Sequence, residues 1–197
     1  DNGGRIEHIS YTVKSLERAG VSAIVIEDKI GLKKNSLFKD QKNAKQDKIS
    51  NFCKKIQSAK KAKISEDFIV IARIESLILG KTLADALKRA DDYSKAGADA
   101  ILIHSKKNNP KEIFAFAKRF KKSRYFKPMV AVPSTYSKTS EEQLIRNGFK
   151  IVIYANHMMR ASYPAMTEAA KSILKHKKSY PIENKITPIK DILILIK

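Results

Sequence analysis

The sequence predicts an α/β fold in which helices cover a parallel sheet, and three observations carry that prediction. Five short apolar segments alternate with stretches whose apolar residues recur at helical spacing. Strands separated by helices pair in parallel through right-handed crossovers, so either a doubly wound sheet or a TIM-type barrel fits. Polar residues follow the predicted strands, and no glycine-rich phosphate loop does, which favours the barrel over a nucleotide-binding sheet.

The individual elements follow from local signals. The first helix, 6–19, repeats apolar residues at helical spacing and ends at Gly20, and strand 21–26 is a β-branched run. Thr82 and Ser140 carry hydroxyl side chains of the kind that cap helix N-termini. The other expected helices are 49–62, 83–96, 110–120, the segment between Ser140 and Gly148, and 161–175, and the other strands are 68–74, 98–103, 129–132 and 149–154.

The organisation along the chain is that of one domain with a long insertion. The 197 residues predict a single domain over 1–197, since domains average roughly 150 residues, with the last helix and tail over about 158–197. A polar stretch, about 29–47, is too long for a routine connector and predicts a lid. A (β/α)8 barrel usually needs ~250 residues. The chain opens abruptly at Asp1, so we expect two or three N-terminal strands of the barrel to be absent from this sequence.

The charge is strongly positive, with 40 Lys and Arg against 20 Asp and Glu, a net +20. Such a charge attracts nucleic acids and phosphate compounds, and residues 119–127 interleave basic and aromatic side chains as a stacking patch would. The lysines are spread along the chain and many fall on polar helix faces, so a solvated surface is favoured over a nucleic-acid partner. In that interpretation residues 119–127 end a helix, with Phe120 and Phe126 in the core.

Other features exclude whole classes of protein. No apolar run approaches the ~18 residues of a membrane span, so no membrane partner is expected. The single cysteine, Cys53, excludes an internal disulfide and a zinc site built from several cysteines, and it favours a reducing compartment. No signal-peptide pattern opens the chain, and the expected location is the cytoplasm.

Side chains capable of chemistry gather after the predicted strands. In a barrel the carboxyl ends of the strands open at one mouth, where active sites lie. An arginine within an apolar strand is costly unless paired, and its planar guanidinium suits a phosphoryl group as well as a carboxylate. The strand-end residues are Glu27, Asp28, Arg73, Glu75, His104, Ser105, Ser134, Thr135, Asn156 and His157.

Several segments, in order along the chain, resemble the signatures of the phosphoenolpyruvate mutase family. Residues 27–36 read Glu-Asp-Lys, five variable residues and Asn-Ser, and residues 71–75 read Ile-Ala-Arg-Ile-Glu. Residues 96–107 are nearly identical to that family's next strand. The other similar segments are Asp1 with Gly3, 130–139, 154–162 and 182–192, so the resemblance runs from Asp1 to about Leu193.

The resemblance implies a modified TIM barrel of the isocitrate lyase superfamily, which exchanges its last helix between the subunits of a homodimer or homotetramer. It also implies a small-molecule substrate and the Mg²⁺-dependent interconversion of phosphoenolpyruvate and phosphonopyruvate, the entry step to natural phosphonates. A phosphonopyruvate hydrolase or a carbon–carbon lyase of the same superfamily is the alternative enzyme. The alternative from a different class is a basic nucleic-acid-binding module on an inactive barrel.

For the site, the resemblance assigns catalysis and substrate binding to Arg73 and His104, which would hold the migrating phosphoryl group. From the residues alone, Arg73 also fits a structural ion pair with Glu75 or Glu27, and His104 also fits a satisfied core histidine. The implied metal residues are Asp1 and Glu27, acting through water, with the direct aspartate ligand placed before this chain begins. By themselves, Asp1 would be a turn or cap residue and Glu27 a surface acid.

On the expected lid, the resemblance assigns catalysis to Lys33 and Asn35, and substrate binding to Asn35 and Ser36. These residues would seal the site, because water would convert phosphonopyruvate to pyruvate and phosphate. Only the register favours Lys33 over Lys34. By itself the segment would be an ordinary solvated loop.

Overall fold

The computed structural model describes residues 2–31, 35–37 and 44–195, and its main sheet has five parallel strands. Their order is β1–β4–β5–β6–β7, so the order follows the sequence and does not reverse. A doubly wound sheet reverses its order at a switch point, whereas a barrel does not. The strands are β1 (Ala23–Glu27), β4 (Ile69–Ile74), β5 (Ala100–Ile103), β6 (Met129–Ala131) and β7 (Phe149–Val152).

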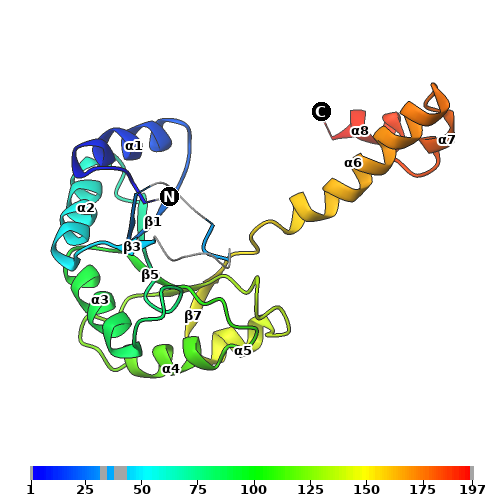
Figure 1. Cartoon of the computed structure of the whole chain (residues 1–197). Helices are drawn as coiled ribbons and strands as arrows, with labels where there is room; N and C mark the ends of the chain where they lie inside the picture. The colour runs from blue at the N-terminus through cyan, green and yellow to red at the C-terminus, as the bar shows by residue number, and fades with distance from the viewer. Residues whose placement is uncertain (1, 32–34, 38–43, 196–197) are drawn as a thin grey trace. The chain divides into compact units, whose positions relative to one another are not determined.

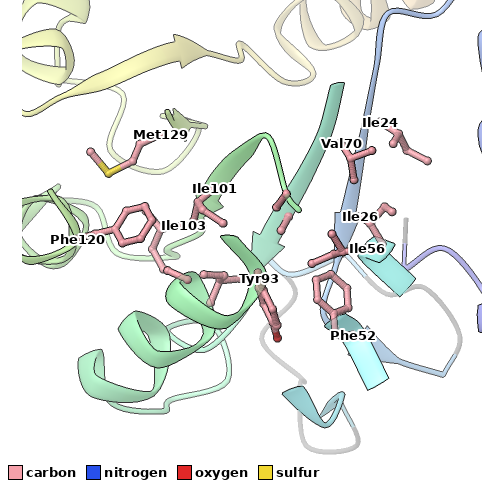
Figure 2. Packing of buried hydrophobic residues seen from close by; sticks show 14 of the residues in the cluster. Ile24, Ile26, Phe52, Ile56, Val70, Tyr93, Ile101, Ile103, Phe120 and Met129 are labelled. Atoms are coloured by element: carbon pink, nitrogen blue, oxygen red, sulfur yellow. The ribbon is translucent and has the colours of Figure 1, made fainter. Parts of the chain in front are cut away.

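Helices cover the outer face of this sheet (Figure 1). Ile24 of β1, Val70 of β4 and Ile101 of β5 face the helices, because alternate residues of a strand point to opposite faces of the sheet. They share one buried cluster with Phe52 of α2 and Tyr93 of α3, as Figure 2 shows. The helices of this layer are α1 (Ile6–Arg18), α2 (Ile49–Ala62), α3 (Leu83–Lys95), α4 (Lys111–Phe120) and α5 (Glu141–Arg146).

The inner face of the sheet has a core of its own. Among the described residues, its buried members come from strands alone, which is the interior of a barrel and not the second helical layer of a doubly wound sheet. This inner cluster consists of Ile71, Ala100, Leu102 and Val130, with Ala23, Val25, Val132, Ile151 and Ile153 packed partly buried against it.

Most predicted elements form close to their expected places. Helix α2 has the predicted bounds, and the expected caps are present: Thr82 accepts from the backbone N–H of Asp85, and Ser140 forms a capping box with Gln143. The start predicted for the last helix, at 161, is wrong, because α6 begins at His157. A start at 161 would place Pro164 in the first turn, where a missing N–H costs nothing, but the helix carries this proline in its interior.

By its internal contacts the chain divides into two compact units, Asp1–Ile153 and Tyr154–Lys197. The second unit holds α6 (His157–His176), α7 (Tyr180–Glu183) and α8 (Ile189–Ile194). The single domain over 1–197 and the absent N-terminal strands stay predictions. None of the helices in the described residues combines the length and the apolar content that crossing a membrane requires.

The two ends of the expected lid pair with each other. Strand β2 (Lys29–Ile30) and strand β3 (Lys45–Gln46) form a two-stranded antiparallel ladder. Sequence reasoning missed this ladder because two-residue strands are too short to show a period. The pairing holds the base of the 29–47 segment beside the carboxyl end of β1.

The basic and aromatic stretch 119–127 is partly a core feature. Phe120 is buried, as the core interpretation predicts, whereas Phe126 is 40% exposed and its ring lies 5.5 Å from that of Phe120. Of the two phenylalanines, only Phe126 therefore offers an accessible ring.

Phe52 is the test of the outer core. Its side chain is fully buried, with its ring centroid 4.6 Å from that of Tyr93. Because a cavity would remain, Phe52→Ala should lower the free energy of unfolding by about 3 to 5 kcal/mol, measured by urea denaturation. Ile64→Ala, at a side chain that is 66% exposed, is the control and should stay within about 0.5 kcal/mol of wild type. Equal effects of the two substitutions would contradict this core.

Candidate active site

Three predicted site residues converge on the inner face at the carboxyl end of the sheet. Glu27 and Arg73 are register partners on β1 and β4, and Arg73 lies two residues after the inward-facing Ile71. His104 follows β5, two residues after the inward-facing Leu102. Because residues two apart in a strand share a face, the strand geometry directs these side chains to one place.

The buried carboxylate of Glu75 holds this cluster together. Its Oε1 accepts a hydrogen bond from Arg73 Nε at 2.7 Å and lies 2.9 Å from His104 Nδ1. Its Oε2 accepts a hydrogen bond from the Ser36 hydroxyl and lies 3.4 Å from Lys29 Nζ. Side chains from three separate stretches of the sequence therefore meet on one carboxylate.

Glu75 is an anion at neutral pH. Burial by itself would raise the pKa of Glu75, but the hydrogen bond to His104 and the positive charge of Arg73 outweigh burial and hold the pKa well below its usual range. A buried anion in this place fixes the guanidinium of Arg73 by a charge-assisted hydrogen bond.

Arg73 combines the structural ion pair with a capacity to bind a ligand. Its Nη2 donates to Ser36 Oγ at 3.0 Å and lies 3.5 Å from Glu27 Oε2. Among the described residues, none accepts a hydrogen bond from its Nη1. The side chain is 20% exposed, so the guanidinium can be reached from solvent while Glu75 holds its other edge.

His104 is a neutral imidazole placed between an anion and a cation. Burial lowers the pKa of His104, and the neighbouring Arg73 charge adds to this, while Glu75 opposes it. Nδ1 lies 2.8 Å from Arg73 Nη2, which only donates, and 2.9 Å from Glu75 Oε1, which only accepts. Nδ1 satisfies one of these at a time, so the tautomer decides whether Nε2 presents a proton or a lone pair.

A second buried carboxylate, that of Asp28, lies directly behind Glu75. Its Oδ1 accepts the backbone N–H of Glu75 at 2.9 Å, and its Oδ2 lies 3.1 Å from Arg89 Nη1. Burial raises the pKa of Asp28 to about 6, although the Glu75 N–H and the charge of Arg89 act in the opposite direction.

The structure brings four of the sequence-predicted residues together: Glu27, Ser36, Arg73 and His104. Asn35 is exposed beside Ser36, and its Oδ1 accepts the backbone N–H of Leu37 at 2.9 Å. The turn made by this contact presents Ser36 to the buried carboxylate.

Two predicted site residues, Asp1 and Lys33, lie outside the described residues, as does the second candidate, Lys34. Asn156 and His157 belong to the unit that starts at Tyr154.

Sequence reasoning did not assign Lys29 or Glu75 to the site. Lys29 Nζ donates to Ser36 Oγ at 2.8 Å and lies 3.6 Å from Glu27 Oε1. A signal for both exists in the sequence, because each stands two residues beyond a strand-end residue that was assigned to the site, Glu27 or Arg73.

The described residues do not form a metal centre by themselves. Within the part of the chain that the structure describes, no three His, Cys, Asp or Glu side chains form a group that could hold a metal ion. Glu27 is the oxygen donor that fits such a role, because its buried carboxylate lies at the end of β1. Mg²⁺ keeps several waters and needs few protein carboxylates.

Comparison with known sequences identifies the family. The family model described as phosphoenolpyruvate phosphomutase matches residues 1–174. The chain is 38% identical over 192 residues to a phosphoenolpyruvate phosphomutase of Tetrahymena pyriformis, covering 98% of the chain and 63% of that protein. It is 37% identical over 193 residues to a phosphonopyruvate hydrolase of Variovorax sp. (strain Pal2), covering 98% and 65%.

Solved structures agree. The chain matches the crystal structure of phosphoenolpyruvate phosphomutase from Streptomyces platensis subsp. rosaceus with a TM-score of 0.90 and 38% identity, over 98% of this chain and 66% of that one. A phosphonopyruvate hydrolase in complex with oxalate and Mg²⁺ matches with a TM-score of 0.85 and 35% identity, over 98% and 65%.

The fold similarity extends to a 2,3-dimethylmalate lyase of the PEP mutase/isocitrate lyase superfamily, with a TM-score of 0.76 at 20% identity. These likenesses confirm the predicted fold class, an α/β fold of the TIM-barrel kind. The chain spans 63% to 66% of the length of the two phosphomutases and the hydrolases named above. The chain belongs to the phosphoenolpyruvate phosphomutase family.

Proposed function

We propose that the protein is a phosphoenolpyruvate mutase, which interconverts phosphoenolpyruvate and phosphonopyruvate by moving a phosphoryl group between oxygen and carbon. The observation that carries the proposal is the Arg73–Glu75–His104 cluster at the mouth of the inner face. Phosphoryl transfer needs positioning and charge stabilisation more than covalent chemistry by the protein. A guanidinium held on one edge and a neutral imidazole supply both.

Each residue of the cluster has a role in this proposal. Arg73 binds the phosphoryl oxygens through the edge of its guanidinium that Glu75 leaves open. His104, held by Glu75 through Nδ1, lines the place of the same group. Ser36 holds the lid segment on the site through its contacts with Arg73 and Glu75.

The charge balance of the cluster supports a Mg²⁺ cofactor. Lys29 and Arg73 formally cancel Glu27 and Glu75, and the pKa of His104 is lowered, so the described cluster is close to neutral. A substrate with a phosphoryl and a carboxylate group therefore requires further positive charge. We propose that Glu27, with Asp1, holds Mg²⁺ through water. When bound, the ion would supply positive charge to balance the negative groups of the substrate.

The lid residues would separate the mutase from a hydrolase. We propose that Asn35, with Lys33, closes over the substrate and keeps water from the phosphoryl group. An amide donates a hydrogen bond but does not act as a base toward water. Phosphonopyruvate hydrolase is the second candidate function, because a hydrolase is among the relatives at nearly the same identity as the phosphomutases.

We also propose that the protein forms a homodimer or homotetramer that exchanges its last helix. Only Ile182 is buried among the described residues of unit 154–197. Large apolar side chains of this unit are more than half exposed, which a soluble protein rarely leaves uncovered. They include Met158, Met159, Tyr163, Met166, Leu174, Leu193 and Leu195.

Phosphorus NMR of the full-length protein with phosphonopyruvate and Mg²⁺ tests the reaction. The wild type should give phosphoenolpyruvate with little free phosphate. Asn35→Ala should lose most of this turnover, and the residual activity should shift toward pyruvate and phosphate, because water gains access. Wild type that releases mainly phosphate would replace the mutase with the hydrolase. A variant that behaves as wild type would refute the lid role alone.

Arg73→Lys should lower kcat/KM by on the order of 10²-fold while Mg²⁺ affinity barely changes, because lysine keeps the charge and loses the planar fork. Steady-state kinetics and Mg²⁺ titration measure the two effects. Near-wild-type turnover would leave Arg73 with a purely structural ion pair.

Glu75→Gln should lower kcat/KM by on the order of 10²-fold, since the group that orients Arg73 and His104 loses its charge. The pKa of His104 should fall further, because the anion that opposes the effect of burial is gone. An NMR titration of the histidines measures this shift. Glu66→Gln, at a fully exposed carboxylate paired with Lys63, is the control and should change neither quantity. An unchanged His104 titration in Glu75→Gln would contradict the arrangement.

A further inference from the structure

The carboxylate of Asp28 is the most fully satisfied buried acid of the described structure, and the proposed reaction does not use it. Its Oδ1 accepts from the backbone N–H of Glu75 at 2.9 Å. Its Oδ2 accepts from Gln46 Nε2 at 2.8 Å, from Tyr93 Oη at 2.8 Å and from Arg89 Nη1 at 3.1 Å. The residue has no exposed surface.

These partners come from separate parts of the fold. Gln46 belongs to β3, the returning end of the 29–47 segment, and Arg89 and Tyr93 belong to α3. The backbone of Asp28 extends the same junction, because its N–H donates to the carbonyl of Arg73 and its carbonyl accepts from the N–H of Asp47 at 2.7 Å. Asp28 therefore joins β1, β4, α3 and the base of the lid segment at one point.

Stability alone gives little reason for such a junction. Removing a carboxylate and a guanidinium from water costs several kcal/mol, and packed apolar residues often replace buried ion pairs without loss. What apolar residues would not reproduce is a fixed acceptor for the Glu75 N–H. The same residue, Glu75, carries the side chain that contacts Arg73, His104 and Ser36.

We propose that Asp28 is a positioning residue of the active site, which sets the orientation of the Glu75 side chain, and through it of Arg73 and His104, relative to the base of the lid segment. The proposal rests on the proposed function for its kinetic consequence. Its geometric content, that Asp28 orients His104 through Glu75, stands apart from the identity of the reaction.

Asp99 provides a matched comparison at the opposite end of β4. Its Oδ2 accepts the backbone N–H of Val70 at 2.8 Å, and its Oδ1 lies 2.6 Å from Lys60 Nζ of α2. Like Asp28, it joins a backbone N–H of β4 to a basic side chain of a neighbouring helix. Because it lies at the amino end of the sheet, it should contribute to stability without reaching the site.

The test compares Asp28→Asn with Asp99→Asn in the full-length protein. The amide introduced by Asp28→Asn would keep an acceptor for one partner but turn an NH₂ group toward donors. With phosphonopyruvate and Mg²⁺ as the probe, kcat should fall by on the order of 10²-fold while KM changes far less, because misplaced groups lose transition-state contacts. The ¹⁵N signals of the His104 ring should shift. Asp99→Asn should lower stability and leave kcat and those signals unchanged.

Two milder variants keep the test decisive if Asp28→Asn does not fold. Tyr93→Phe and Gln46→Leu each remove one donor to Oδ2 and leave the carboxylate in place. Each should lower kcat several-fold. When combined with Glu75→Gln, each should lower kcat by a smaller factor than it does alone, because both act through Glu75. Wild-type kcat with unshifted His104 signals in these folded variants would overturn the proposal.

The histidine signals separate this proposal from the proposed function. If the wild-type protein fails to convert phosphonopyruvate, the mutase is refuted, and the His104 signals alone decide the role of Asp28. A shift in Asp28→Asn and none in Asp99→Asn supports positioning. Unshifted signals in a folded Asp28→Asn, or the same shift in both variants, overturns it.

Discussion

The Glu75 carboxylate has no access to water, and a buried anion is tolerated only when cations and donors inside the protein replace its hydration. Strand β4 supplies Arg73 itself, but His104 comes from the end of β5 and Ser36 from the segment after β1. Satisfying one carboxylate therefore draws three parts of the chain to the same point. The candidate active site is the result of that requirement.

The same requirement sets the electrostatics of the site. Glu27 and Glu75, the two acids of the candidate active site, each face a cation, since both lie close to Lys29 and Arg73. Pairing of this kind prevents repulsion between the carboxylates, but it leaves little net positive charge for an anionic ligand. Arg73 can serve both purposes because a guanidinium binds along two edges, which an ammonium group does not.

A second buried carboxylate, that of Asp28, forms a deeper hydrogen-bond network behind Glu75. Asp28 accepts from the backbone of Glu75, from α3 and from the base of the 29–47 segment. The two networks share Glu75, whose N–H belongs to the deeper one and whose side chain belongs to the site. The base of the lid segment is thus connected to the groups at the mouth through a continuous chain of hydrogen bonds.

The sequence by itself determined the succession of strands and helices, the caps at Thr82 and Ser140, and the gathering of Glu27, Arg73 and His104, because periodicity, capping and strand alternation act over a few residues. It left open whether the sheet is doubly wound, whether Arg73 forms a structural ion pair, and where Ser36 lies. Only the tertiary structure decided these, together with the β2–β3 ladder and the central position of Glu75. The physical reason is that a buried polar group is satisfied by partners far away in sequence, and no local pattern states which of several donors will reach it.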